Sequence, residues 1–249
     1  MGNIKKDTFI CLDCETTGLD VENDEIIELA IAKFTYDEIL DKFETLIDPK
    51  RPISQESIEI HKITDEMVSG KPKIEEILHK TLEMINGYTI VGHNIGFDIS
   101  MLIQASKKRG IPFSIDLKNS IDTLRLARLY ADSPSNSLEV LRKHFNIEDE
   151  GAHRAMSDVI VNIKVFKYLI GDFKTTEEIR KRLIDPIELK TMPLGKYKGR
   201  ILRDVPSDYL NWASHQNFDM DLSYTILKER RKRRSHPPFS GSSNPFADL

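Results

Sequence analysis

Residues 11–18, CLDCETTG, hold two kinds of side chain that could do chemistry. Asp13 and Glu15 stand two residues apart, so in a β-strand both carboxylates point to one face. Carboxylates that face together repel each other unless they share a cation, and their hard oxygens suit Mg²⁺ or Mn²⁺. Acids at the end of a strand are also common as solvated surface groups. The pair alone leaves both interpretations open.

Cys11 and Cys14 are the only cysteines in the chain and offer a second chemistry. Their Cys-x-x-Cys spacing could serve redox exchange, but reactive motifs of this kind place the first cysteine at a helix N-terminus. Here Phe9, Ile10 and Leu12 give the pattern of a buried strand. Two cysteines cannot complete a four-cysteine zinc site. We therefore interpret both thiols as packing residues on opposite faces of the strand, with no disulfide between them.

Two further acids lie near predicted helix starts. Asp98, in GHNIGFD, is one turn into a helix that Asn94 is predicted to cap, where an acid could simply favour the helix dipole. HRAMSD places His153 at the start of a long helix and Asp158 about one and a half turns inside it. An acid in that largely apolar helix needs a reason, although a single one could be exposed to solvent.

The hydrophobic pattern supplies the elements that must position these groups. Three apolar strands with short turns favour an antiparallel meander, and helices then alternate with shorter strands. The predicted strands are TFICLDCE, 26–34, 39–47, YTIVGHN and a short one within 119–131, and the main predicted helices are 73–86, 94–110, SLEVLRKHF and 154–170. This order predicts an α/β fold with a mixed sheet.

Charge divides the chain unevenly. The totals of 39% hydrophobic and 31% charged residues are ordinary for a globular protein. Residues 180–234 carry 14 Lys/Arg and 7 Asp/Glu, whereas residues 1–179 carry 22 and 32. An acidic body with a basic module suits a metal-binding enzyme that holds a polyanion. We expect a catalytic domain over 1–173, a linker helix over 174–190, a small basic domain over 191–234 and a disordered tail over 235–249.

Nothing in the sequence predicts a membrane protein. No stretch approaches the roughly 18 apolar residues that a membrane span needs. The first residues, MGNIKKDTF, lack the apolar core of a secretory signal. We therefore expect a cytoplasmic protein without a membrane partner.

The ordered set of motifs resembles the DEDDh branch of the DnaQ-like 3′–5′ exonuclease superfamily. That family carries Asp-x-Glu on its first strand, a second acid in an HN-x-x-FD-like segment and His-x4-Asp near the end of its domain. The resemblance covers about residues 7–171, and the DCETTGL form is especially similar to the DNA polymerase III epsilon subunit family. It implies a ribonuclease H-like mixed five-stranded sheet flanked by helices.

The resemblance also implies an activity. The expected reaction is metal-dependent release of 5′-mononucleotides from single-stranded or frayed DNA 3′ ends, in proofreading or repair. An exoribonuclease that trims RNA 3′ ends is the first alternative, and a non-catalytic nucleic-acid-binding protein is the second. A DNA polymerase complex and a free-standing enzyme are equally open, because no glutamine-led clamp-binding pentapeptide is evident after the catalytic domain.

By the same resemblance each matching residue has an implied role. Asp13 would bridge two Mg²⁺ or Mn²⁺ ions, Glu15 and Asp158 would complete one site, and Asp98 would support the other. His153 would accept a proton from the attacking water. The implied substrate contacts are Thr16, Thr17, Leu19, Glu56, His61, His93, Asn94 and Phe97.

Some of these contacts have an alternative. EIHKIT resembles the family's HGIT segment, but Lys62 stands where glycine is usual. For Leu19, His61 and Phe97, the sequence is equally compatible with packing in the core and with a contact to the substrate.

The basic module resembles a small domain of uncharacterised role with a GKYKG-type turn and a YL-x-W-type helix. Lys196, Lys198 and Arg200 could contact a phosphate backbone while Tyr197 stacks on a base, and the basic run KERRKRR supports this interpretation. Solvated lysines around a packed tyrosine are the alternative. We expect Trp212, together with Leu210, in the core of the module.

Overall fold

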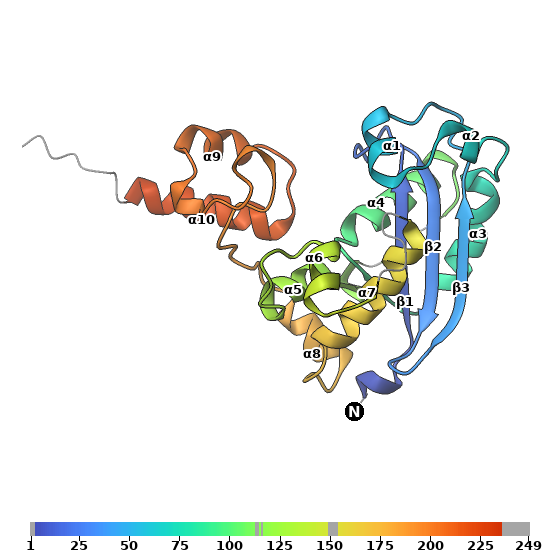
Figure 1. Ribbon diagram of the computed structural model, residues 1–249, viewed down its shortest axis with the longest axis horizontal. Coiled ribbons are helices and arrows are strands. Elements are labelled where there is room, and N and C mark those ends of the chain that lie inside the picture. The colour runs from blue at the N-terminus through green and yellow to red at the C-terminus, as the bar shows by residue number, and fades with distance from the viewer. Residues whose placement is uncertain (1–2, 113–114, 116, 149–153, 236–249) are drawn as a thin grey trace, which may run out of the picture. The chain divides into compact units, whose positions relative to one another are not determined.

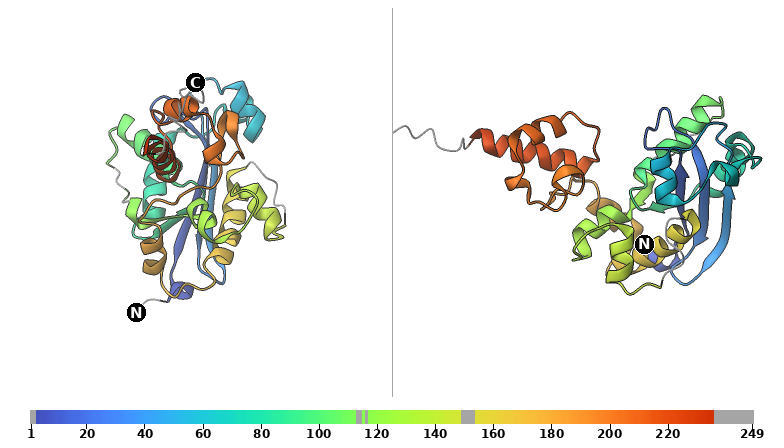
Figure 2. Two further views of the ribbon diagram at one scale, coloured as in Figure 1. Left: turned by 90° about the vertical axis from the view of Figure 1, so that its left-hand side faces the viewer. Right: turned by 45° about the horizontal axis from the view of Figure 1, so that its top comes forward.

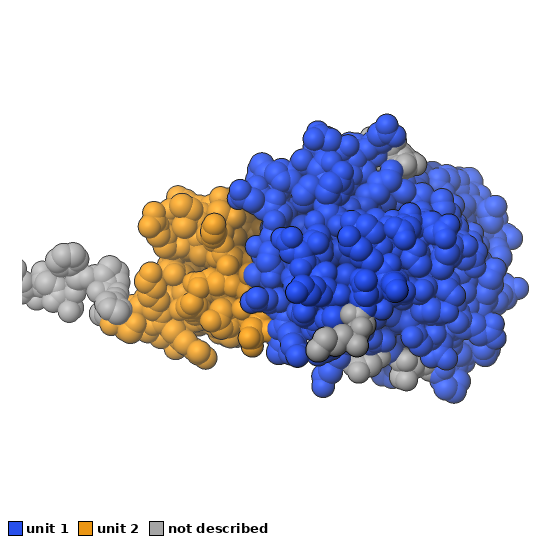
Figure 3. Space-filling model, turned by 90° about the horizontal axis from the view of Figure 1, so that it is seen from below, with its two compact units in different colours: residues 1–184 blue, residues 185–249 orange. Residues whose placement is uncertain are grey.

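The computed structural model consists of two compact units, which Figure 3 shows in different colours. Unit 1 spans Met1–Ile184 and unit 2 spans Asp185–Leu249. The residues that the structure describes are 3–112, 115, 117–148 and 154–235.

Five strands form the central sheet of unit 1, in the order β3-β2-β1-β4-β5 (Figure 1). β1, β2 and β3 pair antiparallel as a meander, whereas β4 and β5 continue from β1 in parallel. The strands are β1 (Phe9–Thr16), β2 (Ile26–Phe34), β3 (Ile39–Leu46), β4 (Thr89–Gly92) and β5 (Ser120–Asp122). The predicted α/β fold with a mixed five-stranded sheet is therefore confirmed.

Helices cover both faces of the sheet, which the left view of Figure 2 shows nearly edge-on. The layer on one face consists of α5 (Thr123–Tyr130), α6 (Leu138–His144) and α7 (Ala155–Leu169). The opposite layer consists of α3 (Ile74–Ile85) and α4 (Gly96–Lys108). Because strand side chains alternate, β1 packs Phe9 and Cys11 toward α7 but Ile10, Leu12 and Cys14 toward α3 and α4. Strand β1 is thus buried on both sides.

The boundary between the units lies after α8 (Thr176–Arg182), although the sequence predicts a linker helix over 174–190. Ile179 is fully buried in the core of unit 1, and Thr176 Oγ1 donates a hydrogen bond to Asp7 Oδ2 at 2.6 Å. These contacts make α8 part of the first unit.

The start of α4 differs from the predicted one. Asn94 does not cap the helix: its backbone is left-handed, with φ of 63°, and its N–H donates to Asp122 Oδ1 at 2.9 Å. Ile95 occupies the cap position without a side-chain hydrogen bond, and the helix begins at Gly96. The tight turn between β4 and α4 therefore depends on an acid from the neighbouring strand β5.

Two short helices, α1 (Gln55–His61) and α2 (Asp65–Val68), follow the meander. Ser54 caps α1 by accepting a hydrogen bond from the N–H of Ser57. Lys62 ends this helix in the left-handed conformation, with φ of 61°. That conformation favours glycine and explains why the resembling segment usually has one.

Unit 2 has a small core of its own. Its elements are η3 (Gly195–Tyr197), η4 (Leu202–Asp204), α9 (Ser207–Ala213) and α10 (Met220–Ser235). Leu210 is fully buried there, as predicted, but Trp212 is 52% exposed, so its assignment to the core is wrong. The N–H of Ile187 donates to buried Asp221 of α10, which ties part of the predicted linker to this unit.

The remaining elements are the 3-10 turns η1 (Ile4–Lys6) and η2 (Leu117–Asn119) and the isolated bridge Thr191–Ile201. Across the described ranges, no helix combines the length and the apolar character needed to cross a membrane.

The left-handed backbone at Lys62 generates a stability prediction. This conformation costs a non-glycine residue roughly 1–2 kcal/mol. Glycine avoids that cost but loses more backbone entropy on folding, which offsets about 0.5–1 kcal/mol of the gain. Lys62→Gly should therefore raise the free energy of unfolding by up to about 1 kcal/mol in thermal or urea unfolding. Lys107→Gly, in the ordinary helical backbone of α4, is the control and should lower it. Equal destabilisation by both changes would contradict the prediction.

Candidate active site

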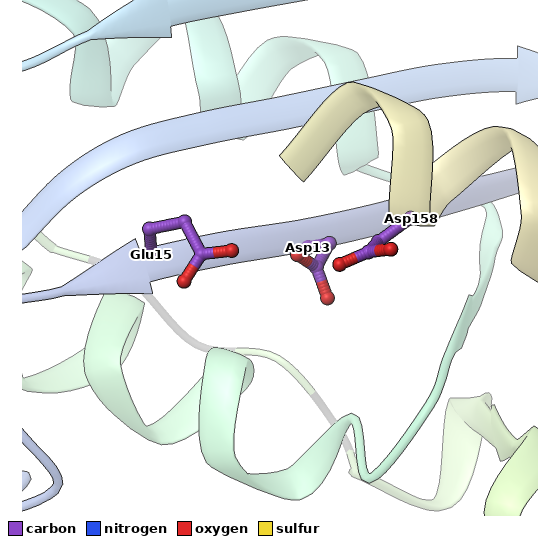
Figure 4. Close-up of side chains that lie close together, drawn as sticks. All are labelled: Asp13, Glu15 and Asp158. Atoms are coloured by element: carbon purple, nitrogen blue, oxygen red, sulfur yellow. The ribbon is translucent and has the colours of Figure 1, made fainter. Parts of the chain in front are cut away.

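Three acids from two elements converge where β1 ends (Figure 4). Asp13 and Glu15 share a face of β1, and Asp158 lies in the first turn of α7. One oxygen from each carboxylate lies within 4.8 Å of the other two. Asp158 reaches the strand because α7 packs across β1 and β2, where the residue beside Asp13 is the small Ala30.

Asp98 approaches the same strand from the opposite layer. It is buried in the first turn of α4, and its Oδ1 accepts hydrogen bonds from the N–H of Cys14 at 3.0 Å and from the Cys14 thiol at 3.1 Å. It lies outside the cluster of three, yet its charge is the strongest neighbouring influence on Asp13. The structure thus gathers three of the four predicted acids around one point and places the fourth nearby.

Burial and mutual repulsion change the acidity of the whole group. Burial raises the pKa of Asp13 well above its usual value, and the charges of Asp98, Glu15 and Asp158 raise it further. Burial, followed by the charges of Asp158 and Glu28, raises the pKa of Glu15 to about 8. Burial also raises the pKa of Asp98 to about 7. A divalent cation would offset both the burial and the repulsion.

The donor set fits a hard divalent ion. All three converging ligand atoms are carboxylate oxygens, which Mg²⁺ and Mn²⁺ prefer. Opposite ligands of an octahedral Mg²⁺ lie about 4.2 Å apart, given Mg–O distances of about 2.1 Å. The observed limit of 4.8 Å therefore requires only a small contraction around an ion. Asp13, Glu15 and Asp158 would hold that ion.

Both cysteines are free and buried, on opposite faces of β1. The Cys11 thiol points toward α7, donates to Val159 O at 3.7 Å and accepts from Asn162 Nδ2 at 3.6 Å. Burial raises the pKa of Cys11 and of Cys14, and nearby acids raise both pKa values further. Neutral, enclosed thiols are poor nucleophiles, which agrees with a packing role.

Glu28 is a site residue that the motifs do not reveal. It lies directly opposite Glu15 in the β1–β2 register and has no exposed surface. Arg154 grips its carboxylate with Nε at 3.1 Å and a terminal nitrogen at 2.6 Å, and the N–H of Ala155 donates to it at 3.1 Å. Glu28 therefore fixes the start of α7. A charged residue in the apolar strand IIELAIAKF was the available signal.

The turn after β1 contains three of the predicted substrate contacts. Thr16 and Thr17 are buried, and their hydroxyls bond to Gly18 O and Asp24 Oδ1. The Thr17 N–H donates to a backbone carbonyl at 2.9 Å, so this amide is not open to a nucleotide. Leu19, in contrast, is 85% exposed. Packing in the core is therefore excluded for Leu19, whose ligand role stays a prediction.

Helix α1 leans on this turn. Ser57 Oγ donates to Thr17 O at 3.0 Å, and the neighbouring Glu56 is exposed. His61 is only 2% exposed, and its Nδ1 accepts from the N–H of Ile63. Burial lowers the pKa of His61, so the ring is neutral near pH 7. In this conformation Glu56 can meet a ligand, whereas His61 is enclosed at the end of α1 and its Nε2 has no hydrogen-bond partner in the structure.

The segment between β4 and α4 holds the remaining three predicted contacts. His93 Nδ1 lies 3.0 Å from Thr123 Oγ1, and burial lowers the pKa of His93 to about 4. Asn94 is exposed, and Phe97 is partly buried against the α3–α4 layer. His93 is thus a neutral ring held by its neighbours, and Asn94 and Phe97 keep surface for a ligand.

Five predicted residues remain, His153 and four residues of the basic module. His153 falls outside the described residues. Lys196, Lys198 and Arg200 are exposed in unit 2, with Tyr197 partly buried among them.

The exonuclease family model RNase_T matches residues 10–166, which is more than half of the chain. DNA polymerase III subunit epsilon of Aquifex aeolicus (strain VF5) is 33% identical over 190 residues, covering 72% of this chain and 93% of that protein. DNA polymerase III PolC-type of Clostridium perfringens is 34% identical over 196 residues, covering 76% of this chain. The chain spans only 13% of the length of that PolC-type relative.

Comparison with solved structures agrees with the fold. Exonuclease X in complex with 5′ overhanging duplex DNA has a TM-score of 0.55 and 26% identity, covering 70% of this chain and 98% of that one. In the C-terminal part, residues 180–221 match a model described as "Putative quorum-sensing-regulated virulence factor". The long match over unit 1, the epsilon relative and the shared fold show that this chain belongs to the DnaQ-like exonuclease family.

Proposed function

We propose that the chain is a metal-dependent 3′–5′ exonuclease that releases 5′-mononucleotides from single-stranded or frayed DNA 3′ ends. The convergence of Asp13, Glu15 and Asp158 carries this proposal, because three half-buried carboxylates at one point are costly unless a cation joins them. Family membership supports the nuclease chemistry. The named relatives are DNA polymerase III proteins, which favours DNA over RNA as substrate.

Each residue has a place in the proposed reaction. A pair of Mg²⁺ or Mn²⁺ ions would supply an acidified water and stabilise the departing 3′-oxygen. Asp13 would be a ligand shared by the two ions, Glu15 and Asp158 would complete one site, and Asp98 would support the other. His153 accepts the proton of the attacking water, a task suited to imidazole with its usual pKa of roughly 6.5.

The surroundings of the acids favour a strand terminus over an internal phosphate. Leu19 projects from the turn directly after the Asp13 and Glu15 strand, and its exposed side chain can wedge against the last base. Gly18 permits this turn, since a Cβ there would lie 2.4 Å from the Asp24 carboxylate. Glu56 is exposed on the helix that leans on the same turn and can accept a bond from the 3′-hydroxyl.

The biological setting follows from the relatives. Their names favour a role in proofreading or repair, in the cytoplasm, either within a DNA polymerase complex or alone. An enzyme that trims RNA is the alternative. Measuring how fast the protein shortens matched DNA and RNA strands, each labelled at the 5′ end, distinguishes the two substrates.

Asp13→Asn should abolish most of the nuclease activity. Loss of an outer partner in a metal site typically costs 10–100-fold, so loss of the bridging ligand should cost more than about 100-fold. The measurement is the rate of single-nucleotide shortening of a labelled DNA strand with Mg²⁺ or Mn²⁺. Asp41→Asn, on exposed β3, is the matched control and should keep full activity. Undiminished shortening by Asp13→Asn would refute the proposed site.

The raised pKa of Glu15 predicts how the metal-free protein responds to pH. The pKa of this group is about 8 in the fold, against its usual 4.5, so the folded state binds the proton more tightly. Stability from this source is present below about pH 4.5 and is lost as the pH rises toward 8.

The melting temperature without metal should therefore fall between pH 5 and pH 8, and Glu15→Gln should make this fall smaller. Added Mg²⁺ or Mn²⁺ should raise the melting temperature more at pH 8 than at pH 5, because the ion competes with the protons. If the melting temperatures of the wild type and of Glu15→Gln fell equally with rising pH, the repulsion assigned to Glu15 and its neighbouring acids would be contradicted. Glu139→Gln, at a surface acid paired with Arg142, should not flatten the curve.

Glu28 acts as a positioning residue in this account. It holds Arg154, which directly follows His153, and the first N–H of the helix that carries Asp158. Glu28→Gln keeps the size of the side chain but removes its charge and one acceptor. The start of α7 should then shift relative to β1.

We expect Glu28→Gln to lower kcat by on the order of tenfold to a hundredfold, as for other groups that orient metal ligands. KM should change little, and higher Mn²⁺ concentrations should restore part of the rate. Glu139→Gln removes a surface acid–arginine pair far from β1 in sequence and should leave kcat unchanged. A loss of stability without any change in kcat or in metal dependence would show that Glu28 is structural only.

A further inference from the structure

Unit 2 presents a cluster of aromatic rings, defined here as Tyr197, Tyr209 and Trp212. The ring centroids of Tyr197 and Tyr209 are 4.7 Å apart, and those of Tyr209 and Trp212 are 5.1 Å apart. Trp212 is 52% exposed, although the core of the unit lies on the same helix at Leu210 and Ala213. A large apolar ring kept at the surface beside two others indicates a contact surface.

The cluster is held in shape by the backbone beneath it. Tyr209 and Trp212 are three residues apart on α9, so they are neighbours on one face of the helix. Tyr197 ends the turn η3, which begins at Gly195 with φ of 72°. A Cβ at Gly195 would lie only 2.6 Å from the Tyr209 hydroxyl. Glycine therefore allows the turn to approach α9 and to bring the rings together.

Two cations flank Tyr197 in the aromatic cluster, and a third follows Tyr197 directly in the sequence. Lys196 Nζ and Arg200 Cζ each lie 5.7 Å from the centre of the Tyr197 ring, and Lys198 is exposed between them. Within the described part of unit 2, the ion pairs that the structure records involve none of these three side chains. Their charge is thus available to an outside anion.

In the basic run at the end of α10, Arg231, Lys232 and Arg234 are exposed, but two other arginines bond within the unit. Arg233 donates to the carbonyls of Leu202, Arg203 and Val205 and pairs with Glu229, and Arg230 bonds to side chains of α9. These arginines hold the unit together. The combination of open charge with stacking rings belongs to the aromatic cluster and not to the whole run.

We propose that the aromatic cluster and its three cations form a binding surface for single-stranded nucleic acid. Bases would stack on Trp212 and the adjacent tyrosines, and Lys196, Lys198 and Arg200 would contact the phosphates between them. This recognition tolerates any sequence, because every base has a stacking face. It requires unpaired bases, which a duplex does not offer. The surface consists of residues of unit 2 alone, and this inference does not rest on the activity proposed for unit 1.

Trp212 is the only tryptophan of the chain, so its fluorescence reports on this surface alone. The experiment titrates the full-length protein in EDTA, which prevents metal-dependent cleavage, with oligothymidylate, oligouridylate and a DNA duplex of equal charge. Single strands should quench and shift the Trp212 emission, and the effect should weaken as salt is added. The duplex should quench far less at equal phosphate concentration. The comparison of the two single strands shows whether the sugar matters.

Variants separate stacking from general charge attraction. Stacking of one base is worth about 1–3 kcal/mol, so Trp212→Ala should weaken oligothymidylate binding about fivefold to 150-fold in an anisotropy titration. Trp212→Phe should retain most of the affinity. Lys198→Ala should reduce both the affinity and its salt dependence. Lys232→Ala, on exposed α10 in the same unit, is the matched control and should have a smaller effect.

Three outcomes would overturn the inference: no change in Trp212 emission with either single strand, equal quenching by the duplex, or equal losses from Lys198→Ala and Lys232→Ala with none from Trp212→Ala. The last would indicate diffuse charge attraction. An active nuclease with silent Trp212 fluorescence would leave the proposed function intact and reject this surface. Quenching of Trp212 by single strands in a protein that cleaves none of them would support this surface and reject the proposed function.

Discussion

Repulsion among half-buried carboxylates is the constraint around which unit 1 is built. Asp13, Glu15 and Asp158 are held within 4.8 Å, with Asp98 beside them, so each negative charge raises the cost of the next. Hydrophobic packing on both faces of β1 supplies the rigidity that keeps the strand in place. Repulsion among these carboxylates lowers the stability of the metal-free fold. A bound divalent cation would remove that repulsion, so metal binding would stabilise the folded protein.

The opposed pair Glu15 and Glu28 shows how the fold assigns different tasks to two neighbouring acids. Both lie at the same register of β1 and β2, yet only Glu28 meets an arginine and the N–H groups of a helix start. Its charge is neutralised and serves to position α7. For Glu15, burial and the charge of Asp158 raise the pKa to about 8, so without metal its carboxyl group keeps a proton near pH 7 that a metal ion would displace. The ion pair with Arg154 therefore gives Glu28 a structural role and leaves Glu15 as the candidate metal ligand.

Much of this arrangement is predictable from the sequence, because it depends on local patterns. Alternation in TFICLDCE predicts that Asp13 and Glu15 share a face, and the spacing in HRAMSD places Asp158 on a helix. The remaining features depend on contacts between distant segments. The hydrogen bonds from Cys14 to Asp98 and from Asn94 to Asp122 join residues far apart in the chain, and no periodicity reveals them. Trp212 looks like a core residue by type, but its position on α9 turns it outward.

The two proposals assign a polyanion to both units, which unit 1 would cut and unit 2 would hold. The measurement that tests the central claim most directly is a crystal structure of the full chain with Mn²⁺, using the anomalous scattering of manganese. We predict anomalous peaks about 2.0–2.3 Å from carboxylate oxygens of Asp13 and of Glu15 or Asp158. Well-ordered carboxylates that point apart, with manganese absent from the space between them, would contradict the account.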